Sequence, residues 1–178
     1  MRAILSKETG GPDTLVLEEV EDLEPNADEV IIDVKACGVN YPDYLIIEDR
    51  YQFQPPRSFS PGAEVAGIVA AVGDDVTRLS VGDRVIAAST HGGMATQFRA
   101  TAAQCLPMPD EMPFEDGATL LLTYATAYYA LADRGDLSAG ETLLVLGASG
   151  GVGSAAVELG KALGADVVAA ASTQDKVD

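Results

Sequence analysis

Residues 142–171, TLLVLGASGGVGSAAVELGKALGADVVAAA, decide the fold of the second part of the chain. The apolar run at 142–146 has the length of a β-strand, and its lack of alternation is typical of a strand buried on both faces. Apolar residues across 152–163 then recur at helical spacing before Gly164, which is a helix stop signal. A second apolar run at 167–171 completes a pattern that predicts one βαβ unit, with parallel strands and a right-handed crossover.

A glycine-rich turn joins the first strand to the helix, and Ala148 takes the first glycine position of the GxGxxG pattern of dinucleotide-binding folds. Gly150 lets the backbone approach a pyrophosphate, and Gly153 lets the helix pack close to the strand. The free N–H groups at the helix start, at the positive end of the helix dipole, would then hold the phosphates. The alternative is a glycine-rich turn without a ligand. The predicted cofactor-binding residues of the turn are Ser149, Gly150, Gly151, Val152 and Gly153.

The first hundred residues have a different texture, with short apolar runs at 15–17, 30–34 and 65–69 between glycine and proline turn signals. Short strands separated by such turns predict a small β-barrel-type domain, with one weak helical pattern after Pro42. Alanines, leucines and tyrosines at 115–133 are spaced as in a helix. A β domain therefore precedes helical sequence and the βαβ unit.

The composition limits the classes of function. The chain has 178 residues, 47% of them hydrophobic, which is enough for a packed core and excludes general disorder. Its net charge of −17 would repel a phosphate backbone and an anionic membrane surface, so neither nucleic acid nor membrane is expected as a partner. No apolar run reaches 18 residues and no signal peptide is visible, which makes a cytoplasmic location the expectation. The two cysteines, Cys37 and Cys105, are interpreted as small core residues.

Five short motifs occur in one order along the chain. They are Gly-Val-Asn-Tyr-x-Asp at 38–43, Gly-x-Glu-x-Ala-Gly at 62–67, Gly-Asp-Arg-Val at 82–85, Thr-Ala-Tyr-Tyr at 126–129 and Gly-Gly-Val-Gly at 150–153. Each motif alone is weakly specific, whereas five in sequence are specific. The chain therefore resembles the medium-chain dehydrogenase/reductase superfamily, and within it the zinc-free quinone oxidoreductase branch.

The resemblance implies a mixed fold. A GroES-like β-barrel-type catalytic domain at 1–120 would precede the first βαβ unit of an incomplete Rossmann domain at 121–178, which would bind NADPH. Two strands are too few for a doubly wound nucleotide fold. We therefore expect the chain to be the N-terminal portion of a longer protein, which, as in the resembled branch, would be a homodimer.

The resemblance also bears on zinc. Zinc-dependent relatives carry a cysteine at the position of Asn40 and a histidine at that of Ala63, so only Glu64 remains of the usual set. Catalytic zinc needs three protein ligands. The single histidine, His91, has no identifiable partner and is interpreted as a loop residue. We therefore expect no metal site and no Lewis acid in the reaction.

Hydrogen bonding would then replace the metal, because a donor aimed at the oxygen that becomes negative on reduction stabilises the transition state. The resemblance makes Asn40 and Tyr51 the predicted catalytic residues. The Asn40 amide takes the place of the lost ligand, and the Tyr51 hydroxyl donates or relays a proton. Alternatively, Asn40 is a turn residue that caps the next helix, and Tyr51 is an ordinary half-buried aromatic. Tyr41 is predicted to line the substrate pocket, and Asp43 to cap backbone groups or steady the loop.

The cofactor prediction depends on the region after each apolar strand and on one threonine. Thr126 matches a threonine that lies against the nicotinamide in similar proteins, although by its spacing alone it would bond back to a helix carbonyl. The second strand ends in Ser172 and Thr173, with Lys176 shortly after, and lacks the acidic residue that binds the ribose of NAD. Two hydroxyls and a cation suit a 2′-phosphate, so NADPH is the predicted cofactor, although Asp175 weakens the preference. The alternative is a helix N-cap at Ser172 with a solvated Lys176.

The predicted function is a zinc-independent, NADPH-dependent transfer of hydride to a small molecule, either a quinone or another α,β-unsaturated carbonyl compound. One alternative is an enoyl-thioester reductase of the same superfamily that acts on acyl-CoA, which the small number of lysines disfavours. Another is a non-catalytic NADPH-binding sensor, which would bind the cofactor without turnover.

Overall fold

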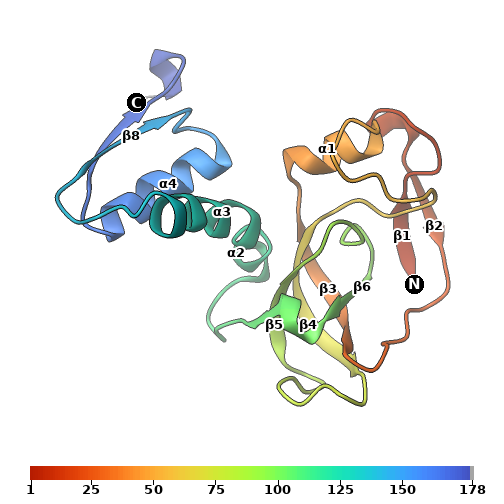
Figure 1. Ribbon diagram of the computed structural model, residues 1–178. Helices are drawn as coiled ribbons and strands as arrows, with labels where there is room; N and C mark the ends of the chain where they lie inside the picture. The colour runs from red at the N-terminus through yellow and green to blue at the C-terminus, as the bar shows by residue number, and fades with distance from the viewer. Residues whose placement is uncertain (177–178) are drawn as a thin grey trace. The chain divides into compact units, whose positions relative to one another are not determined.

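The structure is a computed structural model, and it describes residues 1–176 (Figure 1). The chain divides into two compact units, Met1–Thr119 and Leu120–Asp178. Within residues 1–176, no helix is both long and apolar enough to cross a membrane.

The first unit is built on a five-stranded antiparallel sheet (Figure 1). Its strands are β3 (Glu29–Gly38), β4 (Glu64–Val72), β5 (Arg84–Ala88), β6 (Gln97–Thr101) and β7 (Cys105–Pro107). The order across the sheet is β6-β3-β4-β5-β7, which places the two long strands β3 and β4 next to each other. A separate antiparallel pair consists of β1 (Arg2–Leu5) and β2 (Val16–Glu19). Ala3 of β1 and the next residue after the strand, Ser6, form single bridges to Ala95 and Phe59.

The sheet curls into a half-barrel, as the sequence predicted. The β3–β4 pairing contains two register shifts, between Ile31 and Ile32 and between Val34 and Ala36, and such irregularities bend and twist a strand. Side chains from every strand of the sheet then meet in one apolar core. Its fully buried members are Val30, Ile32, Val65, Val69, Leu79, Val85, Ala87, Phe98, Ala100 and Cys105.

Helical turns connect these strands. Helix α1 (Tyr41–Ile47) follows β3 and begins after Asn40, with Pro42 in its first turn, where a missing N–H costs nothing. The weak helical pattern after Pro42 is thereby confirmed. The short helix α2 (Phe114–Gly117) comes near the end of the unit. Two single 3₁₀ turns, η1 (Pro12–Thr14) and η2 (Ala102–Gln104), complete it.

The second unit contains the predicted βαβ arrangement. Its elements are η3 (Leu121–Ala125), α3 (Thr126–Tyr128), η4 (Tyr129–Arg134), β8 (Thr142–Leu146), α4 (Gly151–Ala162), β9 (Asp166–Ala170) and the 3₁₀ turn η5 (Gln174–Lys176). Strands β8 and β9 pair in parallel, with Leu144 opposite Val168. Gly164 ends α4 in the left-handed region at φ 86°, and its N–H donates to the Lys161 carbonyl at 3.0 Å.

The expectation that the first apolar strand is buried on both faces is wrong for the described residues. Leu144 is 58% exposed and Leu146 is 76% exposed, whereas Val145 is buried. Alternate residues of a strand point to opposite faces, and α4 packs on the face that carries Leu143, where a Cβ at Gly160 would lie 2.6 Å from the Leu143 Cδ2. Leu144 and Leu146 point to the other face of this two-stranded sheet, and they remain exposed.

Candidate functional site

The glycine-rich turn between β8 and α4 leaves a set of backbone donors at the helix start. Gly147 turns the chain at φ 70°, and Ala148 then donates its N–H to the Ala170 carbonyl of β9 at 3.0 Å. Gly150 is the N-cap residue, and its own N–H donates to the Gly147 carbonyl at 3.0 Å. The N–H groups of residues 151–153 are the first of the helix and have no acceptor four residues earlier within it. Such a group of donors suits an anion.

Two glycines of this turn differ in the space around them. A Cβ at Gly153 would lie 2.2 Å from the Gly147 carbonyl oxygen and 2.9 Å from the Ala148 Cα, so α4 can approach the turn only because this residue is glycine. A Cβ at Gly150 would meet only the Gly147 oxygen, at 3.5 Å. The space next to Gly150 is therefore open, and a ligand group can approach the backbone there.

A pocket of about 230 Å³ lies beside the same turn. Ser149 and Lys176, two of the predicted cofactor residues, both line it. Glu158 of α4 lines it as well, and its carboxylate accepts a hydrogen bond from the Tyr124 hydroxyl. The structure thus brings Ser149 and Lys176 to one pocket, whereas Ser172 and Thr173, which are exposed, do not line it.

In the first unit, Asn40 is tied to a buried carboxylate. Its amide Nδ2 donates to the Glu64 Oε1 at 2.8 Å, and the Glu64 side chain is only 1% exposed. A Cβ at Gly38 would come within 2.8 Å of the same oxygen and 2.2 Å of the Ala118 carbonyl, so glycine is required beside this pair. Asn40 is also the N-cap residue of α1, as its alternative interpretation predicted, and its catalytic role stays a prediction. The hydrogen bond to Glu64 fixes the plane of the amide.

Asp43 steadies the loop from the other side. Its Oδ2 accepts the Asn40 backbone N–H at 2.8 Å, and its Oδ1 accepts the N–H of Gly62 at 3.1 Å. Burial raises the pKa of Asp43, and the backbone donors of Asn40, Gly62 and Ala63 lower it in part. The carboxyl group therefore connects the start of α1 to the segment before β4.

Tyr51 and Tyr41 lie in different environments. Tyr51 is half-buried and packs against a small apolar cluster of Ile46, Ile47 and Phe59. Tyr41 is 69% exposed and stacks on Tyr44, with ring centroids 6.2 Å apart. The alternative description of Tyr51 as a half-buried aromatic fits this packing, and its catalytic role stays a prediction.

Thr126 is exposed and is the first residue of α3, between the two π-helical segments η3 and η4. Among the described residues, no hydrogen bond holds its hydroxyl, so the expected bond back to a helix carbonyl is not formed. Single π-turns inside helices are frequent at functional sites. Alanine and leucine spacing cannot distinguish an α-turn from a π-turn, which is why this irregularity was not predicted.

The described residues contain no cluster of three or more histidine, cysteine, aspartate or glutamate side chains that could hold a metal ion. Cys37 is half-buried, and burial, with the charges of Asp43 and Glu64, raises the pKa of its thiol to about 12. Cys105 lies in the core, where burial raises its pKa to about 11. His91 lies in a loop against the rings of Phe53 and Phe59, with centroids 5.9 and 5.7 Å away.

The sequence did not indicate the polar group that forms around Arg57, after the segment that contains Tyr51. Arg57 contacts Ser6, Thr9 and Asp49, residues that are far from it in the sequence or follow no periodic pattern. The contact with Ser6 spans 51 positions, and only an alignment of many related chains would show such a pair as covariation.

Comparisons with known proteins agree with this architecture. Residues 26–110 match the family described as the alcohol dehydrogenase GroES-like domain. The human quinone oxidoreductase is 38% identical over 177 residues, which cover 98% of this chain and 54% of that protein. The quinone oxidoreductase of Thermus thermophilus, solved alone and with NADPH, superposes with a TM-score of 0.87 at 34% identity, over 99% of this chain and 55% of that one. The CurK enoyl reductase superposes with a TM-score of 0.88 at 32% identity, over 98% of this chain and 54% of that one.

A GroES-like half-barrel followed by a βαβ unit with a glycine turn is the arrangement of two-part dehydrogenase-type chains. The chain belongs to the medium-chain dehydrogenase/reductase superfamily. It spans about half the length of the relatives that it matches.

Proposed function

We propose that the chain is part of a zinc-independent oxidoreductase that uses NADPH to reduce quinones or other α,β-unsaturated carbonyl compounds. In this proposal, residues 1–120 form the catalytic domain and residues 121–178 belong to the NADPH-binding domain. The observation that carries it is the turn at 150–153, where the first three N–H groups of α4 have no acceptor within the helix and the space beside Gly150 is open. Relatives named quinone oxidoreductase support the reaction class.

The residues of the second unit fit a phosphorylated dinucleotide. The pyrophosphate would lie beside Gly150 and be held by the N–H groups of 151–153, and Ser149 and Lys176 would supply a hydroxyl and a cation in the adjoining pocket. Ser172 and Thr173 add exposed hydroxyls after β9. The Thermus thermophilus relative solved with NADPH supports the choice of cofactor. NADPH, when bound, supplies the hydride of the reaction.

The residues of the first unit would act on the substrate oxygen. One N–H of the Asn40 amide is held by Glu64, and the second N–H has no partner among the described residues. An oriented amide donor of this kind stabilises negative charge on a carbonyl oxygen without having to reorganise. Tyr51 would supply the proton and Tyr41 would line the substrate pocket, while Thr126 of the second unit would contact the nicotinamide. The reaction then needs no metal ligand from this chain.

A second candidate function is reduction of an enoyl thioester, which the similarity to the CurK enoyl reductase favours. The two candidates are separated by measuring NADPH oxidation in the natural protein with 1,4-benzoquinone and with crotonyl-CoA. A quinone preference supports the first proposal, and a crotonyl-CoA preference supports the second. NADPH binding without turnover on either substrate would point to a sensor.

The choice of NADPH is tested by two substitutions. Ser172→Asp places a carboxylate where a 2′-phosphate would bind, and Lys176→Ala removes the cation. A charge-assisted hydrogen bond contributes about 1.5–3 kcal/mol, so each variant should lose about 10- to 150-fold in NADPH affinity and little in NADH affinity. An unchanged ratio of the two affinities in both variants, or a wild-type preference for NADH, would show the assignment to be wrong.

A further inference from the structure

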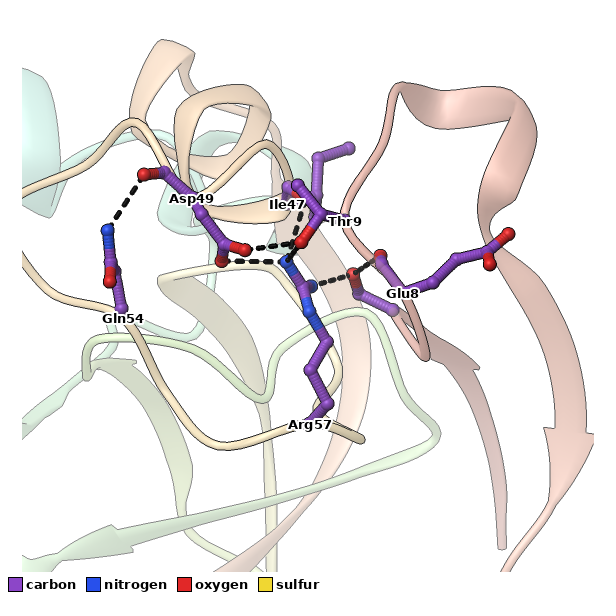
Figure 2. Close-up of polar contacts among 7 residues, drawn as sticks. Glu8, Thr9, Ile47, Asp49, Gln54 and Arg57 are labelled. Atoms are coloured by element: carbon purple, nitrogen blue, oxygen red, sulfur yellow. Dashed lines mark hydrogen bonds and ion pairs between the residues drawn. The ribbon is translucent and has the colours of Figure 1, made fainter.

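Tyr51 lies in the segment that follows the end of α1, and Arg57 lies further along the same segment. Figure 2 shows the Arg57 guanidinium among groups from three separate parts of the chain, namely the N-terminal segment, the end of α1 and the loop that follows it. The Arg57 side chain is 20% exposed. Its charge is therefore largely withdrawn from water and depends on these partners.

The contacts of Arg57 use both terminal nitrogens of the guanidinium. Nη2 lies 2.7 Å from the Asp49 Oδ1, 3.0 Å from the Ile47 carbonyl and 3.2 Å from the Thr9 hydroxyl, while Nη1 donates to the Ser6 hydroxyl. The Thr9 hydroxyl also donates to the second oxygen of Asp49. Both carboxylate oxygens are thus engaged, and these bonds, that from Thr9 first, hold the pKa of Asp49 below its ordinary value.

The Arg57–Asp49 pair acts where the backbone leaves the helix. The Ile47 carbonyl belongs to the last turn of α1 and has no partner further along the helix. It accepts the Gly10 N–H at 3.1 Å and an N–H of Arg57 at 3.0 Å. Asp49 adopts a left-handed conformation at φ 56°, which is uncommon for a residue other than glycine. Its carbonyl accepts the Gln54 Nε2 at 2.7 Å (Figure 2). Asp49 is therefore bound through its side chain and its carbonyl.

These contacts hold both ends of the short loop that contains Tyr51. The Gln54 bond closes residues 49–54 on the far side, and the Arg57 bond joins the start of the loop to its return. Arg57 also lies over the ring of Phe59, 5.1 Å from its centroid, and Phe59 belongs to the apolar cluster on which Tyr51 packs. One guanidinium thus contacts the Asp49 side chain at the start of the loop and Phe59 of the cluster on which the tyrosine packs.

We propose that Arg57, through its pair with Asp49, is a positioning residue that sets the placement of Tyr51 and thereby the rate of substrate reduction. This inference rests on the proposed function, in which the Tyr51 hydroxyl serves the reaction. A displacement of about 1 Å of a reacting group lowers a rate by about 100-fold, so loosening this loop should reduce turnover. Binding of NADPH should not change, because its predicted site is in the second unit.

The test begins with four single variants of the full protein. Arg57→Gln removes the cation, Arg57→Lys keeps the charge without the fork, and Asp49→Asn removes the carboxylate while tolerating the left-handed backbone. Arg50→Gln is the matched control, because Arg50 is a neighbouring exposed arginine that pairs only with Glu48, at 3.0 Å, among the residues that the structure describes. For each, we would measure amide hydrogen exchange of residues 48–56, kcat and KM for the quinone, and the Kd for NADPH.

We expect Arg57→Gln and Asp49→Asn to speed exchange in the loop and to lower kcat by about 10- to 100-fold with an unchanged Kd for NADPH. Arg57→Lys should restore part of the rate, and Arg50→Gln should resemble the wild type. The decisive comparison places Arg57→Gln in a Tyr51→Phe background, where the further loss should be less than about twofold, because residues that act through each other are not additive.

Two results would overturn the proposal in distinguishable ways. An equal loss from Arg57→Gln in both backgrounds would mean that Arg57 does not act through Tyr51. Full turnover in Tyr51→Phe would remove the catalytic role of the tyrosine itself, and the proposed function would lose that residue. In that case, faster amide hydrogen exchange of residues 48–56 in Arg57→Gln would show that the Arg57 contacts stabilise the loop without affecting turnover.

Discussion

Replacement of Gly153 by alanine should destabilise the fold of the second unit, whereas replacement of Gly150 by alanine should weaken only the binding of the ligand. At 153 the added methyl would lie 2.2 Å from the Gly147 oxygen and 2.9 Å from the Ala148 Cα. Non-bonded atoms rest at about 3.5 Å, and both neighbours are backbone atoms, so α4 must move by about 1 Å. Overpacking of this kind costs about 1–3 kcal/mol, from which up to about 1 kcal/mol is recovered through the better helix propensity of alanine.

Gly150→Ala provides the matched control. Its new methyl would have one neighbour at 3.5 Å, and the φ of −86° suits alanine, so the fold should lose no more than about 1 kcal/mol of N-cap preference. The methyl would stand beside the N–H groups that are proposed to hold phosphate. Loss of one charge-assisted hydrogen bond there would weaken NADPH binding by about 10- to 150-fold.

Thermal unfolding and a titration of NADPH fluorescence measure the two effects separately. Gly153→Ala should lower the Tm by several degrees, at about 2–4 °C per kcal/mol for a chain of this size, whereas Gly150→Ala should stay near the wild-type Tm and bind NADPH weakly. A Gly153→Ala variant as stable as the wild type would refute the packing argument. Wild-type affinity in Gly150→Ala would refute the phosphate site.

Three further predictions concern the metal, the histidine and the thiols. Elemental analysis of the dialysed protein should find far less than one zinc per chain, and about one zinc per chain would contradict the proposed reaction. Burial lowers the pKa of His91 from its ordinary 6.5, so the folded state binds its proton less readily and loses stability as the pH falls below that value. In His91→Gln the contribution of the histidine to the Tm decrease between about pH 7 and pH 5 should disappear. Identical pH profiles of the Tm in the wild type and in His91→Gln would exclude this contribution. The pKa values of Cys37 and Cys105 are about 12 and 11, against 9.0 for a free thiol. Iodoacetamide should therefore react at pH 8 about 100- to 1,000-fold more slowly with the folded chain than with the unfolded chain. Equal rates would show that the fold does not protect the two thiols.

The sequence predicted the parts of the fold that depend on local pattern. The apolar run at 142–146 and the glycine turn specify β8, the start of α4 and the parallel strand after it, because strand length, helical spacing and glycine positions are all local signals. The short runs near 30–34 and 65–69 likewise correspond to β3 and β4. The extent of these two strands was underestimated, since their bulges interrupt the alternation by which a strand is recognised.

What the sequence could not predict depends on contacts between distant residues. The bond between Asn40 and Glu64 crosses from the end of β3 to the start of β4, and the motifs placed both residues without showing that they meet. The bonds of Arg57 to Ser6 and Thr9 have no local signal at all. The exposure of Leu144 was also unforeseen, because an apolar run does not reveal which of its faces is covered.

The central claim is that an amide held by Glu64 replaces a metal in activating the substrate carbonyl. Its most direct test is the single-turnover rate of NADPH oxidation by 1,4-benzoquinone in zinc-free natural protein, with wild-type Asn40 and with Asn40→Ala. Removal of one such donor costs about 2.7–4 kcal/mol, so the rate should fall by about 100- to 1,000-fold while NADPH affinity is unchanged. An Asn40→Ala variant that reduces the quinone at the wild-type rate, or a wild type that needs added zinc, would contradict the claim.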